Sequence, residues 1–169
     1  MASPSSQQGY SLTQIVLHWL IAALVIFQIL FGEDIGPAYR AFSKATEPSA
    51  ADLFNANLHV YAGIAIFVLA ILRVAIRVTR GAPAAPADET AAQKYIAAGT
   101  HLVLYLAILV MPITGGVAWF LGVESAAEVH EIGKPLLIVF VTLHVLGALY
   151  QHFVKRSKVM VRMVKPGVA

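Results

Sequence analysis

The sequence predicts an all-α membrane protein, a four-helix up-and-down bundle. Its composition is the first reason: hydrophobic residues make up 59% of the chain and charged residues 12%, a balance far from that of soluble domains. The second reason is that four apolar runs approach or exceed the ~20 residues that an α-helix needs to cross a bilayer. The third is that short connections join these runs on one side, which is typical of antiparallel neighbours. We expect a single domain over residues 1–169.

The first predicted helix covers about residues 12–31, "LTQIVLHWLIAALVIFQILF". It differs from a signal peptide because no basic segment precedes it and no small-x-small cleavage site follows at Phe31-Gly32-Glu33. We therefore expect a retained helix. The second predicted helix covers about residues 58–78, "LHVYAGIAIFVLAILRVAIRV", and is also apolar along its length.

The third and fourth predicted helices cover about residues 95–121 and 129–154, and each contains a proline. Pro112, followed by two glycines, should kink or narrow the third helix near its outer half. In the fourth helix, Pro135 removes the hydrogen bond to the carbonyl four residues earlier, so a kink or a break is expected there.

Basic residues are concentrated on one side of the predicted membrane topology. With the N-terminus inside, that side carries nine of the twelve Lys and Arg, as the positive-inside rule requires of a protein with both termini in the cytoplasm. The outer side keeps Arg40, Lys44 and Lys134 and has seven of the nine acidic residues. The net charge of +3 is therefore interpreted as a signal of membrane orientation, and we expect no nucleic-acid partner.

All six histidines lie within or at the edge of the predicted spans: His18, His59, His101, His130, His144 and His152. One histidine in a membrane helix is usually a satisfied polar contact. Six are harder to satisfy, because lipid offers an imidazole no hydrogen bond and these spans contain almost no carboxylates. A cofactor that occupies the ring nitrogens is the simplest explanation.

The spacing of the histidines predicts how they pair. His130 and His144 are fourteen residues apart, which in an α-helix is roughly 21 Å of rise and nearly four turns, so the two share one face. His18 falls in the inner half of the antiparallel first helix, and His59 falls near the outer end of the second. His59 can therefore meet His130 at the outer level, and His18 can meet His144 at the inner level.

Two bis-histidine sites stacked across a membrane are what a diheme b-type electron carrier needs. Haem is largely apolar, its iron takes one imidazole from each side, and a bundle supplies facing helices. The chain has no cysteine, which excludes disulfides, iron–sulfur clusters and Cys-x-x-Cys-His haem attachment. We expect two non-covalently bound b-type haems.

Arg73 is a candidate for a haem propionate or for a quinone site. It lies fourteen residues after His59, so it shares that helix face and reaches the inner level. Arg77, one turn further on, is equally well explained by the positive-inside rule.

The two remaining histidines leave alternatives open. On geometry alone, either His101 or His152 could replace His18 or His144 as an inner ligand. His152 lies eight residues after His144 and is rotated from it by about 80°, which suits a hydrogen bond or proton transfer to quinone better than haem iron. His101 is equally well explained as a histidine that packs beside the haem.

Several stretches resemble the bacterial cytochrome b561 family: "LHWL", "NLHVYAGI", "GTHLVLYLAILVMPITGG", and "HE" followed by "LHVLGALYQHF". The resemblance covers nearly the whole chain and is strongest to the superoxide oxidase type. It implies that His18 pairs with His144 and His59 with His130 as haem ligands. It also implies a bacterial inner-membrane protein that passes electrons from a periplasmic-side donor to membrane quinone.

For the superoxide oxidase type, the resemblance implies oxidation of superoxide at the outer haem and reduction of ubiquinone near the inner face. The acidic outer side is a poor general attractant for an anion, so we expect local attraction, with Lys134 as the preferred residue. An alternative is a membrane-anchor subunit that accepts electrons from a soluble dehydrogenase or cytochrome. A third hypothesis, metal transport, requires carboxylates or methionines along the spans, and Met111 alone is too little.

Overall fold

The computed structural model describes residues 9–86 and 89–168. The described chain forms four long helices and no strand: α1 (Leu12–Phe31), α3 (Ala50–Arg80), α4 (Ala91–Leu121) and α5 (Glu124–Phe153). Three short elements accompany them: η1 (Gly32–Ile35), α2 (Gly36–Ser43) and α6 (Val159–Arg162). Each of the four long helices lies in a segment long and apolar enough to cross a membrane. The prediction of an all-α four-helix membrane bundle is confirmed.

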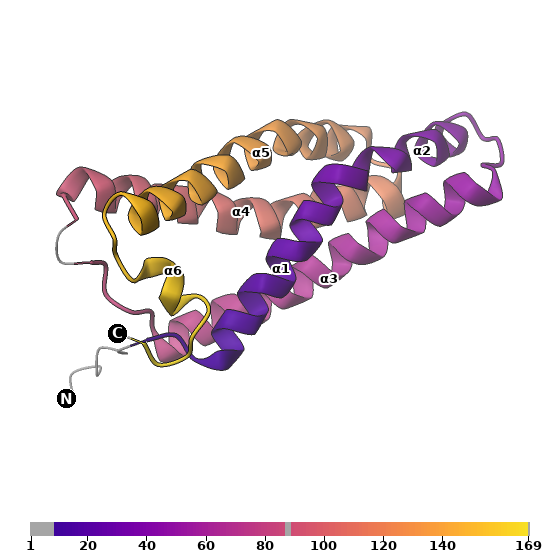
Figure 1. Ribbon diagram of the computed structural model, residues 1–169. Coiled ribbons are helices and arrows are strands. Elements are labelled where there is room, and N and C mark those ends of the chain that lie inside the picture. Colours follow the sequence, from indigo (N-terminus) through magenta and orange to yellow (C-terminus); the bar gives the residue numbers. More distant parts are fainter. Residues whose placement is uncertain (1–8, 87–88, 169) are drawn as a thin grey trace.

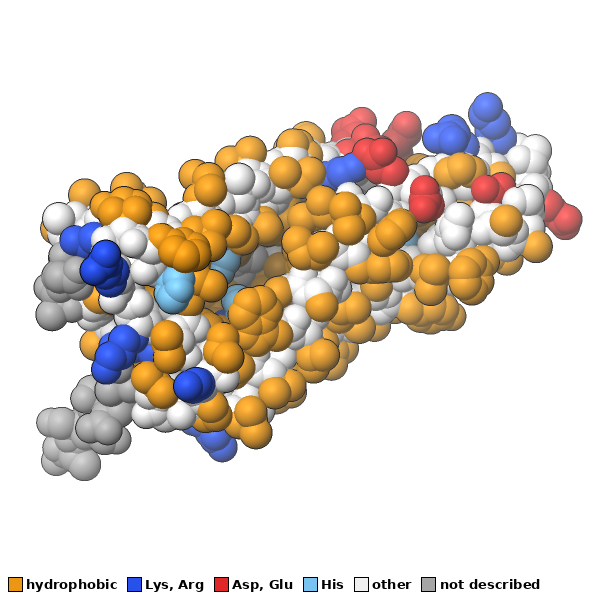
Figure 2. All heavy atoms as spheres, in the orientation of Figure 1, with side chains coloured by type: hydrophobic (Ala, Val, Ile, Leu, Met, Phe, Trp, Pro, Cys, Tyr) orange, Lys and Arg blue, Asp and Glu red, His pale blue; other side chains and the backbone are white. Residues whose placement is uncertain are grey.

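Successive long helices run in opposite directions along one axis (Figure 1). The described ends of the chain meet at one end of the bundle, where the Gly167 N–H donates to the Tyr10 carbonyl at 3.0 Å. Lys and Arg side chains gather at this end and Asp and Glu side chains towards the other (Figure 2). We call them the basic end and the acidic end.

Capping residues set the helix boundaries more than the apolar runs do. The boundaries of α1 agree with the prediction, and the Ser11–Gln14 capping box starts it. Helix α3 begins eight residues before the predicted start, because the Ser49 hydroxyl accepts the Asp52 N–H at 3.1 Å. A capping box at Thr90 likewise starts α4 before its apolar run. A polar first turn capped in this way lies before the apolar run, so the hydrophobic pattern alone does not predict it.

The two prolines lie inside continuous helices. Pro112 is within α4, and Pro135 is within α5, so the possible break at Pro135 does not occur. Helices α4 and α5 are the most closely packed pair, and a Cβ on Gly133 would lie only 2.8 Å from Met111 Cγ. This packing holds the helix together where one backbone hydrogen bond is missing.

A small apolar core lies at mid-height of the bundle. Each long helix contributes at least one side chain: Ile21, Val25, Ile66, Ala107 and Leu137. Leu137 lies seven residues from His130 and seven from His144 on α5, so the core separates the two histidine levels. Many other large apolar side chains are exposed, as expected where the surrounding medium is lipid.

The helices do not pack equally against one another. Beyond α4 with α5, close packing joins α1 to α3 and α3 to α4. Neither α1 with α5 nor α3 with α5 belongs to the closely packed pairs of the described chain. These two separated pairs of helices are the ones that carry facing histidines.

Candidate functional site

The acidic end contains the first histidine pair. His59 of α3 and His130 of α5 have ring centroids 5.9 Å apart. The Nδ1 of His130 lies 2.8 Å from the Met111 carbonyl oxygen. A carbonyl can only accept, so Nδ1 donates and the other ring nitrogen, Nε2, keeps its lone pair. That is the tautomer a metal-binding histidine needs.

The fold makes room for the His130 ring by means of a glycine. A Cβ on Gly115 of α4 would lie 2.9 Å from both Cε1 and Nδ1 of His130. No side chain other than hydrogen fits there without moving the ring. This contact explains why position 115 is a glycine. At the adjacent Gly116 a Cβ would meet only Phe120, at 4.0 Å, so packing does not explain the second glycine.

The basic end contains the second histidine pair. His18 of α1 and His144 of α5 have ring centroids 6.0 Å apart. His101 of α4 lies closer still to His144, at 5.2 Å between centroids. Histidine side chains line a hollow in the surface near this end (Figure 2). Within the described residues, none of these three rings makes a hydrogen bond.

Both pairs have the separation that an iron between two imidazoles requires. An imidazole nitrogen lies about 2 Å from the metal it binds and the ring centroid roughly 1 Å further away, so two axial ligands have centroids roughly 6 Å apart. The helices of each pair are not among the closely packed pairs of the described chain. In the described chain, no three His, Cys, Asp or Glu residues are grouped to hold a metal ion. Each site supplies two protein ligands. Two are enough for haem iron, whereas a bare metal ion takes more protein ligands.

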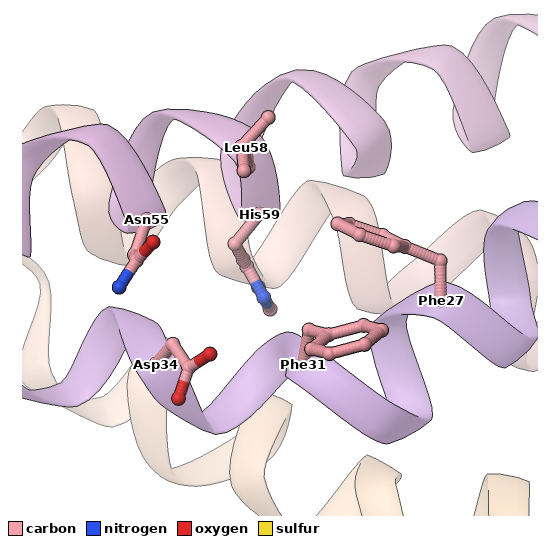
Figure 3. Close-up of a pocket in the computed structure, with 6 residues that line it drawn as sticks. All are labelled: Phe27, Phe31, Asp34, Asn55, Leu58 and His59. Carbon is pink, nitrogen blue, oxygen red and sulfur yellow. The ribbon is translucent and has the colours of Figure 1, made fainter.

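A cavity of about 230 Å³ lies beside His59, between α1 and α3. Figure 3 shows Phe27 and Phe31 on its α1 side and the His59 ring pointing into it from α3. Asp34 and Asn55 form its polar edge. The cavity gives small molecules a route to the neighbourhood of His59, past a carboxylate.

Arg73 reaches the level of the second pair. Its Nη1 donates to the Gln14 carbonyl at 2.8 Å, and it lies close enough to His18 and His144 for its positive charge to act on both rings. Trp19, next to His18, donates from Nε1 to the Met163 carbonyl at 2.7 Å. This bond fastens the C-terminal segment beside the basic-end histidines.

Two other residues singled out from the sequence have local partners. Lys134 forms an ion pair with Glu33, so its charge is partly neutralised at the acidic end. His152 has its ring against Phe153, 4.8 Å between centroids, and lies near the last turn of α5, at the basic end. Neither belongs to a histidine pair.

Comparisons with known proteins identify the family of this chain. A family model described as "Prokaryotic cytochrome b561" matches residues 9–166. The chain belongs to the prokaryotic cytochrome b561 family. It is 33% identical to cytochrome b562 of Cereibacter sphaeroides over 165 residues, 96% of this chain and 99% of that protein.

Two further relatives are each 26% identical over 176 residues and 92% of this chain. They are cytochrome b561 homolog 1 of Escherichia coli K12, with 96% of its length covered, and probable superoxide oxidase CybB of Yersinia pestis, with 95% covered. A member of the family is a membrane electron-transfer protein that carries b-type haem, and the four spans make this chain a multi-pass protein of the inner membrane. The predicted resemblance to this family is confirmed.

Sequence reasoning missed the residues that support the histidines. Gly115 and the Met111 carbonyl fix the His130 ring, and Gln28 donates from Nε2 to the His59 carbonyl at 2.8 Å. Gln28 could have been found, since it is a polar residue within an apolar span and lies fourteen residues after Gln14. A backbone carbonyl leaves no signal in a sequence.

Proposed function

We propose that this chain is a transmembrane diheme b-type cytochrome that passes electrons from the periplasmic side to membrane quinone, with superoxide as the donor and ubiquinone as the acceptor. His59 and His130 bind the haem iron at the acidic end. His18 and His144 bind the haem iron at the basic end. Bound haem supplies the one-electron chemistry that these side chains lack.

The observation that carries the proposal is the pair of histidine pairs, 5.9 and 6.0 Å apart between centroids. They lie on helices that are not closely packed against each other and at two levels roughly 21 Å apart along α5. His101 stays a neighbour of His144 in this assignment, because its 5.2 Å separation is shorter than the span across an iron.

The basic end faces the cytoplasm in this proposal. The concentration of Lys and Arg at the end where the termini meet supports it, through the positive-inside rule. The acidic end then faces the periplasm, where superoxide or another electron donor would arrive.

Each superoxide anion gives up one electron and leaves as dioxygen. Two such electrons and two protons convert ubiquinone to ubiquinol. Lys134 attracts the anion at the acidic end. His152 donates a hydrogen bond or a proton to quinone at the basic end, and the positive charge of Arg73 stabilises a haem propionate or the quinone beside it. A relative named probable superoxide oxidase supports this choice of donor.

A second candidate is a membrane-anchor subunit that accepts electrons from a soluble dehydrogenase or cytochrome. The acidic end supports it, because Lys134 is paired with Glu33 and Asp34 edges the cavity beside His59. Such a surface suits a docking partner with a basic face better than a free anion.

One experiment separates the two candidates. The purified protein is mixed with superoxide, no other protein being present, and the haem absorption bands are followed with and without a soluble ubiquinone. The proposal predicts rapid reduction of both haems, then reoxidation and ubiquinol formation when the quinone is added. Haems that stay oxidised with superoxide, yet are reduced by a dehydrogenase partner, would favour the anchor subunit.

A further inference from the structure

Two buried polar atoms without a partner lie near each other at the acidic end. They are Nδ1 of His59 and Oε1 of Gln28, from α3 and α1. Both adjoin the same point beside Gly32: a Cβ built on that glycine would lie 3.2 Å from the first atom and 3.9 Å from the second. Buried polar atoms in a membrane protein nearly always find a partner, so this juxtaposition needs an explanation.

The orientation of the Gln28 amide follows from its other contact. Its Nε2 lies 2.8 Å from the His59 carbonyl oxygen. A carbonyl cannot donate, so the NH₂ group must face it and the amide cannot be flipped. Oε1 is therefore a buried hydrogen-bond acceptor that receives no hydrogen bond from the described residues.

The tautomer of His59 follows from its proposed role. If Nε2 binds iron, the proton of the neutral ring is on Nδ1, which becomes a donor. The Gly32 backbone also approaches Nδ1, yet no bond there meets hydrogen-bond geometry. The opposite ligand, His130, already has its Nδ1 partner in the Met111 carbonyl.

We infer that Gln28 is the acceptor for His59 Nδ1 when the acidic-end haem is bound, either directly or through one water molecule. The inference rests on the proposed haem ligation by His59. Gln28 is then a positioning residue: Nε2 holds the α3 backbone, and Oε1 fixes the tautomer and the rotation of the ring. An acceptor on Nδ1 makes the imidazole a stronger ligand and favours ferric haem, which lowers the reduction potential.

The test is a redox titration of the purified, haem-loaded protein and its variants. Gln28→Met keeps the length of the side chain but removes the strong acceptor, and it should raise the potential of the acidic-end haem only. Gln28→Glu keeps an acceptor and makes it charged, so it should lower that potential below the wild-type value. Gln14→Leu is the matched control, because Gln14 is also on α1 and also donates to a backbone carbonyl, that of Gly81 just after α3, at 2.9 Å, but at the basic end.

The His59→Ala variant identifies the acidic-end haem in the titration, because this variant should lack that haem. A potential unchanged in both Gln28 variants, or a shift of both haems alike in Gln28→Met, would overturn the inference. If Gln28→Met does not assemble, Gln28→Glu decides alone: a lowered potential supports the inference and an unchanged one overturns it. Loss of no haem in His59→Ala would instead contradict the ligand assignment, so the two failures are distinguishable.

Discussion

His130 and Gly115 are in contact across the α4–α5 interface, where a Cβ on the glycine would lie 2.9 Å from the imidazole ring. At the same edge of the ring, Nδ1 donates to the Met111 carbonyl at 2.8 Å, one turn earlier in α4. The position of one proposed haem ligand therefore depends on a glycine fifteen residues away in the sequence. The position of the His130 ring can therefore be tested by changing Gly115 and leaving every histidine intact.

Gly115→Ala should weaken binding of the acidic-end haem by roughly 10- to 100-fold, because the added methyl group displaces the ring from its bond to Met111. Haem content per chain and the reduced-minus-oxidised spectrum measure the effect. Gly116→Ala is the control, since its Cβ would meet only Phe120 at 4.0 Å. Equal haem loss in both variants would show that the α4 backbone, and not the His130 ring, is the sensitive element.

His144→Ala should lose the basic-end haem and keep the other one. The reason is that one imidazole and its lone pair would be removed from one proposed pair, while His59 and His130 are untouched. His101→Ala serves as the comparison, because its ring also adjoins His144 but is not assigned to iron. Two haems retained in His144→Ala, or one lost in His101→Ala, would require a different basic-end ligand.

His152→Ala should leave both haem spectra unchanged and slow the reduction of ubiquinone. A proton donor near the reacting group typically contributes a factor of roughly 100 or more, so a loss of at least ~10-fold is expected. Stopped-flow reoxidation of the reduced haems by a soluble ubiquinone measures it. An unaltered rate would assign the quinone site elsewhere at the basic end.

The Lys134–Glu33 ion pair predicts opposite effects for its two members. Lys134→Gln should slow haem reduction by superoxide several-fold at low ionic strength, because a cation that attracts the anion is removed. Glu33→Gln should accelerate it, because the cation is then unpaired. Rates that change in the same direction, or not at all, would remove Lys134 from the superoxide route.

The sequence was sufficient to predict the four helices and to expect His59 near His130, for physical reasons, while spacing alone left His101 and His152 as alternatives to His18 and His144 at the basic end. The bilayer requires apolar runs of known length, and a separation of fourteen residues places His130 and His144 on one face of a helix. Helix starts were less accurate, because Ser49 and Thr90 cap polar turns that extend beyond the apolar runs.

What the sequence did not predict depends on packing between distant segments. The effect of Pro135 on α5 depended on how closely α4 packs beside it. The partners of the histidine rings are a backbone carbonyl, a glycine and an amide, from helices far apart in the chain. The pairing of Lys134 with Glu33 likewise joins α5 to η1.

The most direct test of the central claim is the haem content of the purified chain, measured by the pyridine haemochrome method against protein concentration. We predict two non-covalent b-type haems per chain and one in each of His144→Ala and His59→Ala, with a different haem lost in each variant. A wild-type chain with one haem or none, or single variants that each retain two, would contradict it.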